Sequence, residues 1–132
     1  SALNTASTYR AFAERISGIG EKLRALLGGF RKAKKRVVGY GAPAKATTLC
    51  YALGIDEETL EYIVDDSPFK QGLYMPGTHI PIKAPDTLYS DKPDYCLILA
   101  WNFADSIVKN HQQFIKNGGV FIIPVPEPRI LS

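Results

Sequence analysis

The sequence lacks the features of membrane, disulfide-bonded and zinc-binding proteins. No apolar run approaches the ~20 residues that a membrane-spanning helix needs, and no signal peptide is recognisable. Only two cysteines occur, Cys50 and Cys96, each in an apolar setting without C-x-x-C spacing or a nearby histidine. We expect both to be reduced core residues, which predicts a cytoplasmic protein with no metal site in this chain.

Recognisable catalytic arrangements are missing as well. There is no Ser-His-Asp order, no metal-ligand cluster and no paired carboxylates in a supporting context, so the chain presents a binding place without catalytic machinery. His79, in a loop rich in glycine and proline, is a candidate for acid–base chemistry or for contact with a ligand hydroxyl. A structural role in the loop is the alternative. His111 falls within a predicted helix, where we expect it to be solvated.

Basic residues are concentrated at the start of the chain. Nine of the 16 Lys and Arg residues lie in residues 1–36, against two of the 13 Asp and Glu residues. Such a cluster can indicate nucleic-acid binding. Here residues 31–36 follow a predicted helix, whose carboxyl end favours cations, and precede a buried strand. We favour this structural interpretation and expect no nucleic-acid or membrane partner.

The periodicity of apolar residues predicts an α/β domain. Residues 5–34 carry a helical apolar stripe, and residues 1–5 resemble the end of a linker. We therefore expect an N-terminal helical segment, residues 1–35, that packs on a domain of residues 36–132. Strands are expected at 36–40, 60–64, 79–82, 94–100 and 120–123, and helical segments at 44–53, 85–89 and 103–116, the last with Phe103, Ile107, Phe114 and Ile115 inward. This alternation implies a mostly parallel sheet covered on both faces.

The stretch 37–48 is the main candidate site. It reads as a buried strand, a glycine turn and a helix start, and helix N-termini bind phosphates. Its candidate contacts are Tyr40, Gly41, Ala42, Pro43, Ala44, Lys45, Thr47 and Thr48. Gly39-x-Gly41-x-x-Ala44 also fits the alanine variant of the dinucleotide fingerprint, and Asp65 then stands where a ribose-binding acid is expected. Pro43 argues against a standard fingerprint, and Asp65 and Asp66 can instead be strand-end caps or turn residues.

Ligands of such sheets bind at the carboxyl ends of the strands. Unusual polar and aromatic residues gather at the predicted ends, which adds Trp101 and Asn102 to the candidate substrate contacts. The loop Lys70–His79 is expected beside this edge, which adds Lys70 and His79. Asn102 can alternatively cap the following helix.

Four segments, in order, closely resemble the C-terminal domain of S-adenosylmethionine-dependent sugar C-methyltransferases. They are Gly39–Lys45 with Thr48-Leu49, Val64–Ile82, Pro93–Phe103 and Gly118–Pro126, and the resemblance covers residues 9–130. Ala46-Thr47 departs from it, since a Gly-Asn pair is common there. The resemblance implies a Rossmann-like three-layer fold that closes over a nucleotide-linked deoxysugar.

The same resemblance places the other functions outside this chain. In the family, a zinc-binding N-terminal domain and a methyltransferase domain that binds S-adenosylmethionine come first, so no cofactor is expected here and the isolated domain is expected to be inactive. The implied partners are the nucleotide sugar and the upstream methyltransferase domain. The implied reaction is deprotonation beside a keto group followed by methyl transfer to carbon. An NAD-binding oxidoreductase domain and a structural domain without ligand remain the alternatives.

Overall fold

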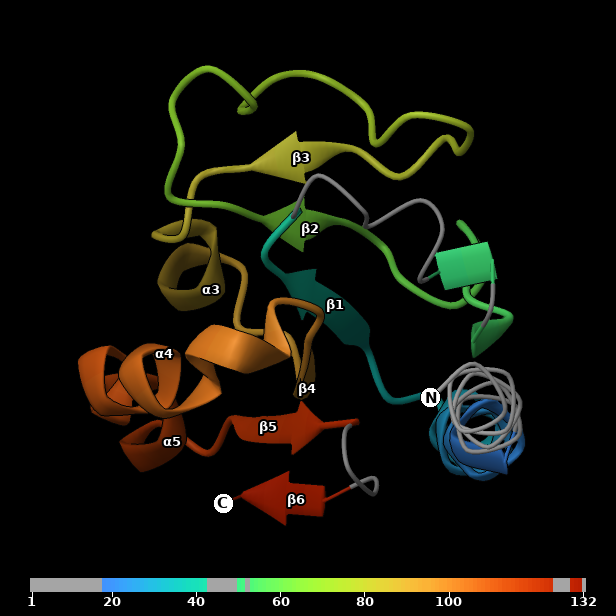
Figure 1. The fold of residues 1–132 in the computed structure, drawn as a ribbon. Coiled ribbons are helices and arrows are strands. Elements are labelled where there is room, and N and C mark those ends of the chain that lie inside the picture. The colour runs from blue at the N-terminus through green and yellow to red at the C-terminus, as the bar shows by residue number, and fades with distance from the viewer. Residues whose placement is uncertain (1–17, 43–49, 52, 125–128, 132) are drawn as a thin grey trace, which may run out of the picture.

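The computed structural model describes residues 18–42, 50–51, 53–124 and 129–131 (Figure 1). Within these residues, six strands form one sheet in the order β3-β2-β1-β4-β5-β6. Their bounds are β1 Val37–Tyr40, β2 Ile63–Val64, β3 Ile82–Lys83, β4 Tyr95–Ile98, β5 Val120–Ile123 and β6 Arg129–Leu131. This is the strand order of a Rossmann fold, so the predicted α/β, Rossmann-like class with a mostly parallel sheet is confirmed.

The sheet changes direction of growth between β1 and β4. All neighbouring strands from β3 to β5 are parallel, and the chain runs outward from β1 to β3 before it returns to add β4 on the other side of β1. In open α/β sheets the crevice at such a reversal, beyond the carboxyl ends of the strands, is the usual ligand site. The fold therefore favours a ligand site formed by the residues that follow Tyr40 and Ile98.

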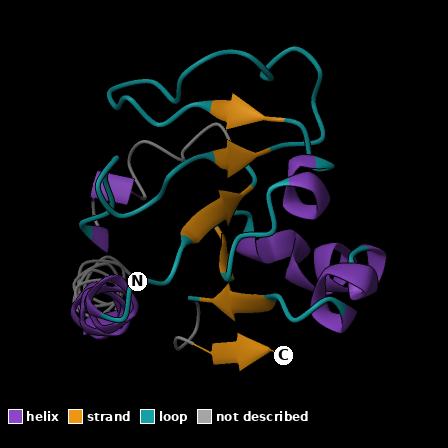
Figure 2. Ribbon diagram, turned by 180° about the vertical axis from the view of Figure 1, so that it is seen from behind, coloured by secondary structure: helices purple, strands orange, loops and turns teal. Residues whose placement is uncertain are grey.

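Alternate side chains along the strands belong to two cores, one on each face of the sheet. Val37, Leu97 and Ile122 join one apolar cluster with Ile19, Leu23 and Leu27 of the helical residues 18–32. Val38, Cys96 and Phe121 join the opposite cluster, beneath α3 (Thr87–Ser90), α4 (Ala104–Asn110) and α5 (Gln112–Lys116). The two views show these three helices on one side of the sheet and the N-terminal helix on the other (Figures 1 and 2).

The two cysteines lie one in each core. Both are buried and free, with Cys50 on the side of the N-terminal helix and Cys96 on the side of α4 and α5. This confirms that both are core thiols. In the part of the chain that the structure describes, no helix has the length and apolarity needed to cross a membrane.

Arg36 fastens the amino end of β1. Its guanidinium donates to Glu61 (2.9 Å) and to Asp91 (2.6 Å), and its backbone amide donates to Asp94 Oδ2 (2.8 Å). The Tyr62 hydroxyl also donates to Asp91 (2.6 Å), and this hydrogen bond, with Arg36, lowers the pKa of the Asp91 carboxyl. The last residue of the basic cluster is therefore structural.

Several predicted elements differ in extent. Residues 18–32 of the predicted helix 5–34 are helical, and its first part lies outside the described residues. The predicted strand 60–64 is a strand only at Ile63–Val64, although the Glu61 amide and the Tyr62 carbonyl also bond to β1. The predicted strand 79–82 forms instead at Ile82–Lys83. β6, antiparallel to β5, was not predicted.

The predicted helix 103–116 is three shorter pieces. A 3₁₀ turn, η1 (Trp101–Phe103), leads into α4, and His111, with φ −124° and ψ 37°, separates α4 from α5. Phe103 was predicted to point inward but is 66% exposed. The prediction is wrong because Phe103 precedes the first residue of α4 and leaves the helical stripe that buries Ile107 and Phe114.

Candidate functional site

The turn after β1 requires glycine. Gly41 has φ +92°, and a Cβ there would lie 2.6 Å from the Ala100 Cβ. Its amide donates to Val64 O (2.7 Å), which ties the turn to the end of β2. Glycine alone combines this backbone conformation with such a close approach, so the turn is held tightly between the carboxyl ends of β2 and β4.

Asp65 braces this turn from the end of β2. Its Oδ2 accepts a hydrogen bond from the Ala42 amide (2.7 Å) and its Oδ1 one from the Ser67 amide (2.8 Å). Lys70 Nζ donates to Ala42 O (2.5 Å), and Gln71 donates to Asp65 O (2.8 Å). The structure therefore uses Asp65 as a strand-end cap, the alternative given above, and the Ala42 amide is already bonded within the protein.

A hollow of about 420 Å³ opens beside the turn, at the reversal between β1 and β4. Its walls come from the ends of β1 and β2, from η1 and from α4. The lining residues are Tyr40, Gly41, Asp66, Ala100, Phe103, Ser106, Ile107, Asn110 and His111. The position is the one that the fold favours for a ligand, so this hollow is the candidate functional site.

A chain of hydrogen bonds runs along one wall of the hollow. The Tyr40 hydroxyl donates to Asp66 Oδ1 (2.8 Å) and lies 2.9 Å from His111 Nε2. The Tyr89 hydroxyl lies 2.6 Å from His111 Nδ1. One arrangement satisfies all three contacts: a neutral His111 donates from Nε2 to Tyr40 and accepts at Nδ1 from Tyr89.

Burial determines the protonation states of Tyr40 and His111 in this hydrogen-bond network. It raises the pKa of Tyr40, and the hydrogen bond to Asp66 raises it further. Burial also lowers the pKa of His111, against a smaller opposing effect of Asp66. Both groups are therefore neutral at pH 7. The prediction that His111 is solvated is wrong, because its ring is held between Tyr40 and Tyr89.

The structure gathers only some of the sequence candidates. Tyr40 and Gly41 line the hollow, while Ala42, Asp65 and Lys70 form the braced turn beside it. Pro43, Ala44, Lys45, Thr47 and Thr48 lie outside the described residues.

The remaining candidates, Trp101, Asn102 and His79, do not line the hollow. Trp101 is half-buried and Asn102 exposed in η1, and no side chain caps α4, so the capping role offered for Asn102 is not seen. His79 is exposed in the loop that precedes β3, on the edge where the parallel strands begin. It is not brought to the glycine turn.

Sequence reasoning missed the wall formed by α4. Ser106, Asn110 and His111 line the hollow but were not candidates, and neither was Tyr89. A signal for His111 was present, since it lies four residues after Ile107 and three before Phe114 and so shares their helical face. A histidine on an apolar stripe predicts a buried polar contact.

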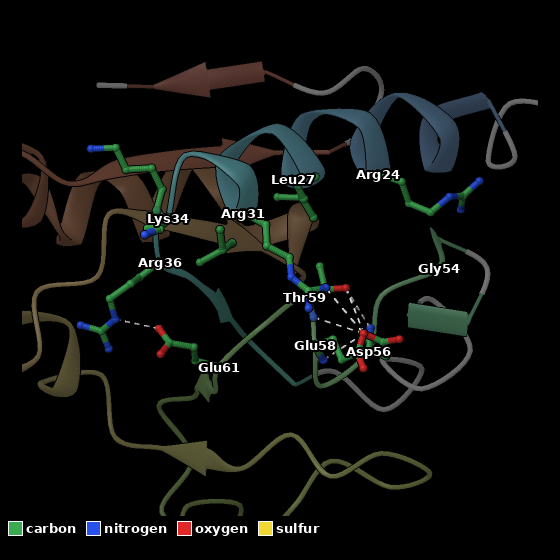
Figure 3. Close-up of a pocket in the computed structure, with 13 residues that line it drawn as sticks. Arg24, Leu27, Arg31, Lys34, Arg36, Gly54, Asp56, Glu58, Thr59 and Glu61 are labelled. Carbon is green, nitrogen blue, oxygen red and sulfur yellow. Dashed lines mark hydrogen bonds and ion pairs between the residues drawn. The ribbon is translucent and has the colours of Figure 1, made fainter.

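A second hollow, of about 470 Å³, lies at the opposite edge of the sheet, beside the amino end of β1 (Figure 3). Basic side chains meet acidic ones there: Arg31 pairs with Glu58 (3.6 Å) and Arg36 with Glu61 (2.9 Å). Among the described residues, no three His, Cys, Asp or Glu side chains come together to hold a metal ion. Charge in this hollow is thus partly compensated within the protein.

Comparison with known proteins relates the chain to C-methyltransferases. A family model described as the C-methyltransferase C-terminal domain matches residues 1–126. C-methyltransferase NovU of Streptomyces niveus is 42% identical over 124 residues, which is 94% of this chain and 30% of that relative. The chain thus spans less than a third of the length of this curated relative.

Proposed function

Because the chain belongs to the family of C-methyltransferase C-terminal domains, we propose that it holds a nucleotide-linked keto-deoxysugar while the complete enzyme methylates a carbon of that sugar. The supporting observation is the hollow of about 420 Å³ at the strand reversal, next to a turn that only glycine can form. A pocket at this place, lined by both polar and apolar side chains, is typical of a small-molecule site.

The proposed role of the domain is positioning. In this proposal the start of the helix predicted at 44–53 contacts the diphosphate, whose charge suits a helix N-terminus, with Lys45 as the proposed cation. Correct placement of a substrate can supply several kcal/mol of a reaction barrier, up to ~7–11 kcal/mol in favourable cases. Binding to the domain would hold the sugar carbon next to the methyl donor.

The methyl donor and the proton-transfer groups belong, in this proposal, to other parts of the complete polypeptide. S-adenosylmethionine and a zinc ion would be bound by domains that precede this one. This chain would supply one wall of the active site and would dock on the methyltransferase domain.

A dinucleotide-binding domain is the second candidate, because the strand order is that of NAD-binding Rossmann domains. Its expected ribose contact, Asp65, has both carboxylate oxygens bonded to backbone amides. This engagement argues against Asp65 as the ribose contact that a dinucleotide site requires.

A thermal-shift series separates these functions. The chain is heated alone and with thymidine diphosphate glucose, thymidine diphosphate, NAD or S-adenosylmethionine. Ligands that bind the folded state raise Tm, so we expect shifts with the two thymidine nucleotides and none with the other two. A shift with NAD alone would replace the proposal by a dinucleotide site, and no shift with any ligand would favour a packing role.

A further inference from the structure

Two adjacent carboxylates follow β2, and they have different surroundings. Both oxygens of Asp65 accept backbone amides. Asp66 is exposed and lines the hollow. Its Oδ1 accepts from Tyr40, and none of the described residues donates to its Oδ2. One carboxylate is thus structural, and the other keeps a free acceptor at the wall of the hollow.

The hydrogen-bond chain fixes the direction of that acceptor. Tyr40 is 3% exposed, and its hydroxyl is bonded on one side to Asp66 and on the other to His111. His111 is in turn held by Tyr89 (2.6 Å). A side chain held in place before binding loses less entropy when a ligand arrives, so Asp66 is a preorganised acceptor.

The charge of Asp66 limits what can bind beside it. A carboxylate repels a phosphate at short range and has no donor hydrogen when ionised. It therefore selects a ligand group that donates, such as a hydroxyl. The diphosphate of a nucleotide sugar is excluded from this wall, whereas a sugar ring is suited to it.

Residues of η1 and α4 add an apolar surface and further polar groups to the hollow. Phe103 lines the hollow although 66% of it is exposed. Ser106 and Asn110, spaced one helical turn apart on α4, add hydroxyl and amide groups. A sugar ring, with an apolar face of C–H groups and hydroxyls around its edge, matches an aromatic side chain bordered by such hydrogen-bonding groups.

We propose that this hollow receives a sugar ring of the nucleotide-linked substrate, with Asp66 Oδ2 accepting a hydrogen bond from a ring hydroxyl and Phe103 covering one face of the ring. The inference rests on the proposed function and adds the sugar-recognising group to it. The ring is either the pentose of the nucleotide or the sugar to be methylated, since both carry hydroxyls.

Calorimetric titration of the chain and its variants tests the proposal. Asp66→Asn and Phe103→Ala are compared with Asp105→Asn and Phe69→Ala. These controls remove the same groups from exposed positions outside the hollow. A hydrogen bond to a charged group contributes enough to change Kd about 10-fold or more. We expect that loss for thymidine diphosphate glucose in Asp66→Asn and a weakening in Phe103→Ala, with both controls unchanged.

Tyr40→Phe tests the positioning step. It removes the hydroxyl that holds Asp66, so Kd should rise, and combining it with Asp66→Asn should add no further loss. Full additivity of the two changes would contradict a shared role.

Two ligands identify the ring. An equal loss for thymidine diphosphate and its glucose ester assigns the pentose, and a loss confined to the glucose ester assigns the transferred sugar. Unchanged binding by Asp66→Asn, or an equal loss in Asp105→Asn, overturns the inference but leaves the proposed function standing. No binding by the unaltered chain overturns both.

Discussion

His111 shows how one side chain connects several elements of the domain. Its ring lies in the break between α4 and α5 and contacts Tyr40 of β1 and Tyr89 of α3 through its two nitrogens. A half-buried imidazole that is neutral can satisfy both tyrosines, whereas a protonated one must donate at both nitrogens. The protonation state of His111 should therefore affect the stability of the domain.

Protonation of His111 should make the domain less stable as the pH is lowered. Its pKa is lower in the folded protein than the ordinary value of 6.5, chiefly because of burial. The unfolded chain then binds more protons as pH falls below that value, and the free energy of unfolding decreases. Urea unfolding between pH 7.5 and 5.5 should show this decrease. His111→Gln should reduce the slope, while His79→Gln, at an exposed position, should retain it. Equal slopes for both variants would contradict this role of His111.

Gly41→Ala should cost more stability than Gly72→Ala. Both glycines have positive φ, +92° and +88°, but an added Cβ meets Ala100 at 2.6 Å in the first case and nothing within 4 Å in the second. We expect about 1–2 kcal/mol for the backbone strain at either position and a further ~1–3 kcal/mol for the crowding at Gly41. Chemical unfolding measures the difference. Equal losses would mean that the turn and β4 can separate at little cost.

At the scale of elements, the N-terminal helix completes one core of the sheet. Ile19, Leu23 and Leu27 belong to the same cluster as Val37 and Leu97, and Phe30 stacks on Tyr95 with ring centroids 3.7 Å apart. The division of the chain near residue 35 remains a prediction, but these contacts argue that the helix and the sheet unfold together.

Leu23→Ala should reveal this cooperation. Leu23 is fully buried, so the substitution should cost about 2–5 kcal/mol and lower the stability of the whole domain in a single transition. Leu26→Ala, at a half-buried position of the same helix, should cost less. Circular dichroism and tyrosine fluorescence would report the unfolding. If only the helix melted earlier while the sheet signal stayed unchanged, the helix would be an independent segment.

Element types were predictable where the apolar pattern is strong, and element ends were not. Cys96, Leu97 and Ile98 are fully buried, and their continuous apolar run indicated β4 without tertiary information. The strand expected at 60–64 is cut to Ile63–Val64, although the Glu61 amide and the Tyr62 carbonyl still bond to β1. The antiparallel β6 follows a segment with prolines at 124, 126 and 128, a composition that gives no strand signal.

The candidate hollow lies at the edge of the sheet that the sequence predicted for a ligand, but only some of the predicted residues line it. Gly41 follows from the strand–glycine–helix pattern. Sequence alone could not choose between Asp65 and Asp66, because neighbouring side chains leave a strand in opposite directions and only the backbone amides nearby show which one is engaged. Tyr89 and His111 meet Tyr40 through the packing of α3, α4 and α5, which local patterns do not contain.

At the scale of the whole molecule, the two edges of the sheet have different characters. The edge where the strands begin carries the hollow of about 470 Å³ between basic and acidic side chains (Figure 3). The edge where they end carries the glycine turn and the hollow of about 420 Å³ with Asp66, Phe103 and His111. The proposed function requires that substrate bind only at the second edge.

Amide chemical-shift mapping tests this requirement most directly. The chain, labelled with ¹⁵N, is titrated with thymidine diphosphate glucose. The account predicts that the largest shifts fall on the carboxyl edge, at Gly41, Ala42, Asp66, Phe103 and His111, while residues of the opposite hollow such as Arg31, Gly54 and Glu58 stay unchanged. Shifts concentrated at Arg31, Gly54 and Glu58 would contradict the central claim.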